Sequence, residues 1–105
     1  MKRPIAALAA FFFVALMANA ASAADPHQGG VLAKQWCASC HVVSADQKNG
    51  STQAPPFSEI AKKPGLTAAS IALFLLRPHP PMPDMNLSRV EAGDLAAYIE
   101  EQGTQ

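Results

Sequence analysis

The sequence predicts an all-α fold made of several short helices. Helix-capping residues precede three apolar segments: Asp25, with Pro26 at a first helical position; Thr67; and Ser88, which forms a Ser-x-x-Glu capping box with Glu91. In the segments that follow these residues, apolar side chains recur at helical spacing. Nothing upstream of the two cysteines has the pattern of a strand.

Residues 1–23 have the pattern of a secretory signal peptide. Two basic residues precede an uncharged apolar run over residues 5–18, and Ala21-Ser22-Ala23 resembles a cleavage site. The run is shorter than the roughly 17–20 residues of a membrane-spanning helix, so we expect cleavage after Ala23, with Ala20 as a second possible cut, rather than an anchor. Residues 24–105 would then form a single domain in the periplasm.

Charge and size limit the classes of function. The chain of 105 residues has 8 basic and 8 acidic side chains, and removal of Lys2 and Arg3 with the signal peptide leaves six against eight, a net charge of −2. The sequence has no stripe of basic residues of the kind that would indicate a nucleic acid partner. A domain this small buries little surface and is expected to need a metal, a disulfide or another staple.

Cys37-Ala38-Ser39-Cys40-His41 has the Cys-x-x-Cys-His spacing of a covalent c-type haem site. We therefore expect one covalent haem c, with Cys37 and Cys40 as tethers on the vinyl groups and His41 as the first axial ligand of the iron. Three other kinds of site were weighed. A thioredoxin-like redox pair would need a βαβ context, a structural zinc site would need more ligands, and a Cys37–Cys40 disulfide would close a short, strained loop.

The first helix of the mature chain is predicted over residues 25–36, where Val31, Leu32 and Trp36 supply apolar contacts. The glycine pair at 29–30 is poor in helix propensity, which suggests the close approach of another helix. The alternative is a frayed amino end. Trp36 either packs on the haem or closes the core.

The last helix is predicted to begin after Ser88 and to stop near Gly103. Its inward face is expected to consist of Val90, Leu95, Tyr98 and Ile99. Its acidic residues are assigned to a solvated face: Asp94, Glu100 and Glu101. The amphipathic period predicts that this helix packs on the first one, with Tyr98 against the glycine pair at 29–30.

After His41 the chain turns polar, and residues 42–56 are predicted to form a compact Ω-type loop over the haem edge. A ligating histidine normally donates its other ring nitrogen to a carbonyl or carboxylate group, and the Pro55 carbonyl is the candidate acceptor. The alternative is that Pro55 and Pro56 only start a short helix over residues 57–62.

The most apolar helix is predicted over residues 66–77, with Thr67 as its cap and Pro78 ending the run. Its inner face is expected to line one side of the haem, although in a domain this small the same face would also serve as ordinary core. The residues assigned to the haem pocket, besides Pro55, are Phe57, Ile71, Phe74 and Leu75, with Leu76 as a further candidate.

A proline-rich loop, Pro78-His79-Pro80-Pro81-Met82-Pro83-Asp84-Met85, follows this helix. A thioether is a weak, soft ligand for haem iron, and prolines restrict the unbound chain, so the bond to a methionine in such a loop would persist. Met82 lies at the centre between prolines and is the first candidate for the second axial ligand. Met85 and His79 are the alternatives, and a methionine can also simply fill the core.

Taken together, these residues resemble the small monohaem class I c-type cytochromes that bacteria export. The resemblance rests on the signal peptide and on WCASCH at 36–41, APPF at 54–57, PPMP at 80–83 and LSRVEAGDLAAYI at 87–99. It implies helices around one haem, with the first and last helices crossed at Gly29. It also implies an axial methionine about sixteen residues before the aromatic residue of the last helix, which fits Met82 and Tyr98.

The same resemblance implies a periplasmic electron carrier rather than an enzyme, in which the iron shuttles between Fe(II) and Fe(III). Such a carrier would be a monomer that meets an electron donor and an electron acceptor at small, transient interfaces, without contact to nucleic acid or, after signal cleavage, to a membrane. Two alternatives stay open: a haem subunit or dedicated electron acceptor of a larger periplasmic dehydrogenase or oxidase, and a haem sensor with a labile sixth ligand.

Overall fold

The structure is a computed structural model that describes residues 23–77 and 80–104. Apart from Ala23, the predicted signal peptide lies outside the described residues, and so do Pro78 and His79. The described helices are α2 (Pro26–Trp36), α3 (Phe57–Ala61), α4 (Ala68–Leu75), α5 (Arg89–Glu101) and the 3-10 helix η2 (Gln102–Thr104). Residues 23–77 and 80–104 contain no strand, which confirms the predicted all-α class.

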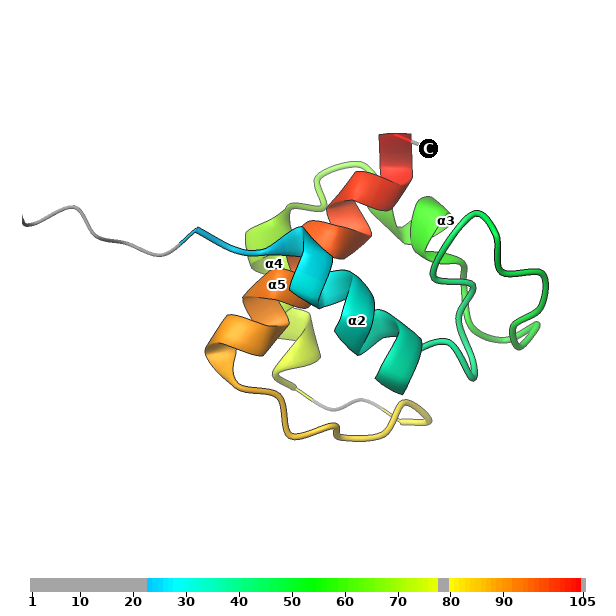
Figure 1. Cartoon of the computed structure of the whole chain (residues 1–105), viewed down its shortest axis with the longest axis horizontal. Coiled ribbons are helices and arrows are strands. Elements are labelled where there is room, and N and C mark those ends of the chain that lie inside the picture. The colour runs from blue at the N-terminus through cyan, green and yellow to red at the C-terminus, as the bar shows by residue number, and fades with distance from the viewer. Residues whose placement is uncertain (1–22, 78–79, 105) are drawn as a thin grey trace, which may run out of the picture.

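Helix α5 is the centre of the arrangement, because α2, α3 and α4 all pack against it (Figure 1). The most extensive packing is between α2 and α5, which confirms the predicted contact of the first and last helices. A buried core lies between these helices and consists of Ala33, Cys37, Val43, Phe57, Ile71, Leu95, Ala96 and Ile99. Among the described helices, none combines the length and the apolar character that a membrane span requires.

The crossing of α2 and α5 depends on two glycines of α2. A Cβ atom on Gly29 would lie 2.0 Å from the carbonyl oxygen of Asp94, and one on Gly30 would lie 3.0 Å from Cε2 of Tyr98. The predicted close approach at this glycine pair is therefore present. At Gly29, however, the nearest neighbour is the backbone of α5, whereas the ring of Tyr98 lies over Gly30.

The three predicted helix caps are all present. Asp25 accepts hydrogen bonds from the amide groups of His27 and Gln28, so the amino end of α2 is capped. Thr67 and Ser88 each accept from the amide three residues on, and each belongs to a reciprocal capping box. The helices are shorter than predicted at their carboxyl ends, where α3 stops at Ala61 and α4 stops at Leu75.

The inward face of α5 differs from the prediction at two positions. Ala92, Leu95, Ala96 and Ile99 form the buried row of α5. Val90 is 72% exposed, because it lies about 200° around the helix from Ala92. Asp94, assigned to the solvated face, is only 9% exposed and accepts a 2.7 Å hydrogen bond from the amide of Asp25. This bond ties the start of α2 to the middle of α5.

The apolar side chains of α2 are less buried than predicted. Val31 and Trp36 of α2 are about half exposed, because the residues that face α5 are the small ones: Gly29, Gly30 and Ala33. The predicted end of the last helix near Gly103 is confirmed, since α5 ends at Glu101 with Gln102 as its C-cap, and the chain continues through Gly103 in η2. A Cβ atom on Gly103 would lie 3.0 Å from Cβ of Ala61, so this glycine allows α3 to approach.

Candidate functional site

The two cysteines and His41 lie on a tight turn that continues directly from α2. Cys37 caps the helix through a 2.9 Å hydrogen bond from its amide to the carbonyl of Ala33, and the amide of His41 donates to the Cys37 carbonyl at 2.8 Å. Cys37 belongs to the buried core, whereas Cys40 is exposed. The turn therefore presents one thiol from inside the domain and the other from its surface.

Two observations disfavour the alternatives of a redox-active cysteine pair and a structural zinc site. Burial, together with the neighbouring Cys40, raises the pKa of the Cys37 thiol to about 11. Reactive cysteines of redox pairs have a lowered pKa instead, because their thiolate is the nucleophile. Within the described residues, no group of three or more His, Cys, Asp or Glu side chains is placed to hold a metal ion, as a structural zinc site would require.

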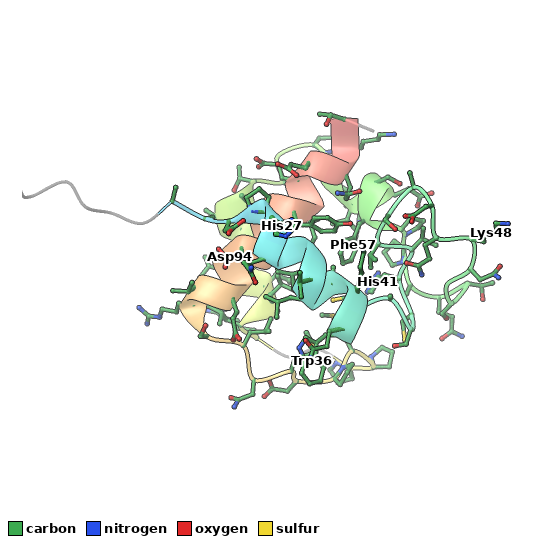
Figure 2. All side chains as sticks on the ribbon, in the orientation of Figure 1. His27, Trp36, His41, Lys48, Phe57 and Asp94 are labelled. Atoms are coloured by element: carbon green, nitrogen blue, oxygen red, sulfur yellow. The ribbon has the colours of Figure 1, made fainter. Side chains whose placement is uncertain are left out.

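The ring of His41 is oriented by the backbone of the following loop. Its Nδ1 atom lies 2.6 Å from the carbonyl oxygen of Pro55, so the predicted hydrogen bond is present. A carbonyl can only accept, so Nδ1 carries a proton, and in the neutral imidazole this leaves the lone pair on Nε2. The ring of Phe57 lies 5.3 Å from the His41 ring, centroid to centroid, and supports it from one side (Figure 2).

The backbone around His41 is held by a continuous set of hydrogen bonds. Each carbonyl from residue 40 to residue 43 accepts from another part of the chain. The donors, in order, are the Ser51 amide at 2.7 Å, Gln47 Nε2 at 2.8 Å, the Phe57 amide at 2.9 Å and the Tyr98 hydroxyl at 2.7 Å. The loop over residues 42–56 is thus firmly tied to the turn, to α3 and to α5.

Gln47 supports the site from behind His41, and sequence reasoning missed it. Its Oε1 accepts from the Val43 amide at 3.0 Å, and its Nε2 is within hydrogen-bond distance of the carbonyls of Ala38, His41 and Asn49. In the sequence it stands among other polar loop residues, and no pattern distinguishes it from them. Its importance comes only from the path of the surrounding backbone.

Two adjoining hollows receive the site residues. The inner cavity, of about 360 Å³, lies between α3, α4 and the turn. Its lining includes every predicted site residue except Cys40 and the further candidate Leu76: Cys37, His41, Pro55, Phe57, Ile71, Phe74, Leu75 and Met82. Ile60, Leu66 and Ile99 extend the apolar lining, and Lys63 adds a positive charge. Sequence reasoning had not assigned these four residues to the site.

The outer hollow, of about 280 Å³, brings Cys40 to the site together with Trp36, Pro81, Pro83 and Met85. Both hollows share Cys37, His41, Pro55 and Met82. Met82 therefore lines the same space as His41, whereas Met85 lines only the outer hollow. A largely apolar space lined by thiols, an imidazole and a thioether suits a hydrophobic, iron-containing group.

Comparison with known proteins gives one informative relative. No protein-family model and no solved structure matches the chain. The chain is similar to cytochrome c-552 of Bradyrhizobium diazoefficiens, with 51% identity over 86 residues. The aligned part covers 82% of this chain and 83% of that relative.

Proposed function

The chain belongs to the small c-type cytochromes, and on this premise we propose that it is a periplasmic carrier of single electrons with one covalently attached haem. A cytochrome of this kind contains haem c with iron, carries electrons and is not an enzyme. The haem iron supplies the redox chemistry by alternating between Fe(II) and Fe(III). The protein's contribution is to attach, ligate and shield that iron.

On the side of the turn, Cys37 and Cys40 tether the haem through thioether bonds and His41 provides one axial ligand. The hydrogen bond from Nδ1 of His41 to Pro55 supports this assignment, because it leaves the Nε2 lone pair free for the iron and fixes the plane of the ring. The hydrogen bonds to the backbone carbonyls of residues 40–43 keep that ring in place.

On the opposite side, Met82 provides the second axial ligand. The observation that carries the proposal is that Met82 and His41 line both hollows together, whereas Met85 does not reach the inner one. With one imidazole and one thioether, the reduction potential is raised and no position is open for a substrate. A haem held by these two residues would exchange electrons with a partner at its exposed edge.

The remaining lining keeps water from the iron. Phe57 and Ile71 are buried, and Phe74 and Leu75 extend the apolar wall along α4. Lys63 brings a positive charge to the same lining, where it can offset the carboxylates of a haem. These residues complete the haem pocket.

Export and partners follow from the sequence. Residues 1–23 act as a signal peptide, and residues 24–105 form the mature domain in the periplasm. The net charge of −2 of residues 24–105 and the absence of a basic stripe favour protein partners, an electron donor and an acceptor, met by a monomer at transient interfaces.

The test is the absorption spectrum of the purified, haem-loaded protein beside Met82→Ala and Met85→Ala. We expect the weak band of a sulfur–iron bond near the red end of the oxidised spectrum in the wild type and in Met85→Ala. Met82→Ala should lose that band and have a lower reduction potential, because its thioether ligand is gone. Methionine ligation by Met85 would instead reverse the two variants. A wild type that is high-spin and binds carbon monoxide readily would refute the carrier and favour a sensor or an enzyme.

A further inference from the structure

The loop that carries Met82 is held far less firmly than the loop behind His41. Among the described residues from 80 to 87, the hydrogen bond present is a local one, from the Asn86 amide to Asp84 Oδ1 at 2.8 Å. The next anchor is the capping box of Ser88 and Glu91, at the start of α5. Side-chain packing must therefore position the segment around Met82.

Trp36 is the large side chain placed to supply that packing. It is the last residue of α2 and lies beside the loop that leads into α5 (Figure 2). It lines the outer hollow together with Pro81, Met82, Pro83 and Met85, so the indole and the loop bound the same space. Since Trp36 is 46% exposed and lies outside the buried core, it does little for the packing of the helices.

The chemistry of these groups suits a contact that holds the loop. An indole buries a large apolar area against prolines and makes favourable contacts with thioether sulfur. Iron–thioether bonds are weak, so a methionine ligand is in equilibrium with a released state in which the loop has swung away and an outside ligand can bind. A side chain that packs only on the closed loop shifts this equilibrium toward the bound methionine.

We infer that Trp36 is a positioning residue that packs on the loop of residues 80–87 and keeps Met82 on the iron. This inference rests on the proposed function, because it assumes that Met82 is the axial ligand. Trp36 lies outside the buried core, so its role is not to close the core. The indole acts on the iron only through Met82.

Imidazole binding to the oxidised, haem-loaded protein at fixed pH measures the released state directly. The apparent affinity of an outside ligand is its intrinsic affinity multiplied by the fraction of molecules in which the sixth position is open. In Trp36→Ala we expect imidazole to bind about tenfold more tightly than in the wild type, which corresponds to about 1.4 kcal/mol of lost loop stabilisation. Trp36→Phe, which keeps an aromatic ring, should bind imidazole no more than about threefold more tightly.

Val31→Ala is the matched control, because Val31 lies on the same helix, is 49% exposed and does not line either hollow. Its imidazole affinity should equal that of the wild type. If Trp36→Ala does not acquire haem, Trp36→Leu takes its place, with an expected increase of about threefold.

The outcomes separate the two proposals. The role of Trp36 would be overturned, and the function left intact, by two results together. The wild type would show the sulfur–iron band, and Trp36→Ala, or its substitute Trp36→Leu, would bind imidazole as tightly as the wild type. An equal increase in Val31→Ala would also overturn it, since the effect would then be a general loosening. A wild type without the band would overturn both proposals.

Discussion

Replacing Gly29 with alanine tests the helix crossing on which the fold depends. A Cβ atom at this position would lie 2.0 Å from the carbonyl oxygen of Asp94, 2.6 Å from its carbonyl carbon and 2.8 Å from Cβ of Tyr98. The first two are backbone atoms inside α5, which cannot rotate away as a side chain can. Relief can therefore come only from a movement of one helix against the other.

The size of the effect follows from that movement. Ordinary contact for a Cβ atom begins at about 3.4 Å, so α2 and α5 must separate by roughly 1.4 Å at this point. Overpacking costs typically about 1–3 kcal/mol, while the better helix propensity of alanine returns about 0.5–1 kcal/mol. Because the clash is with rigid backbone, the cost falls at the upper end of that range, and after the propensity gain we expect Gly29→Ala to lower the free energy of unfolding by about 2–2.5 kcal/mol.

Gly93→Ala is the control for the same chemical change. Gly93 lies within α5, and a Cβ atom there would meet no atom within 4 Å. This variant should be more stable than the wild type by about 0.5–1 kcal/mol, since only the propensity gain applies. Denaturant unfolding of the haem-loaded proteins, followed by circular dichroism, measures both. Equal stability of the two variants would refute the reasoning, because the crossing would then accept a methyl group.

Two further predictions concern the loop behind His41. Gln47→Met keeps the length of the side chain but leaves the carbonyl of His41 and the Val43 amide without their partner. We therefore expect the free energy of unfolding, measured with denaturant, to fall by about 1–3 kcal/mol. An unchanged midpoint would show that water replaces the side-chain amide. Tyr98→Phe should cost about 1–2 kcal/mol at neutral pH, since the hydroxyl donates to Val43. Burial, with Asp46 and Glu101, raises the pKa of Tyr98 above 10.0, so this hydrogen bond should stabilise the wild type fully below about pH 10 and be lost as the pH rises through the folded pKa. Tyr98→Phe should lack this alkaline decline.

The parts of the molecule that sequence reasoning predicted are those whose cause is local. The helix caps at Asp25, Thr67 and Ser88 depend on residues within one turn, and each is present. The turn of Cys37, Cys40 and His41 is contiguous in the chain. The hydrogen bond from His41 to Pro55 spans fourteen residues, yet it was predictable because a ligating histidine needs an acceptor and the proline segment returns to the site.

The parts that were missed depend on tertiary contacts. Asp94 reads as a surface acid, but the glycine opposite it brings α2 so close that its carboxylate caps the amide of Asp25. Val90 reads as a core residue by composition, yet its angle around α5 turns it outward. Gln47 has no sequence signal at all, because its four backbone partners converge only when the loop is folded.

The two sides of the site are built on different physical principles. Behind His41, backbone carbonyls, an amide side chain and a tyrosine hydroxyl fix the chain through hydrogen bonds that are lost only if the loop unfolds. Around Met82, prolines limit the freedom of the open chain, and side-chain packing completes the closure. Of the two proposed ligands, the imidazole on the rigid side is therefore the permanent one. If Met82 is the second ligand, its thioether on the packed side is the one that outside ligands would displace, and the proposed role of Trp36 means that packing alone would tune that exchange.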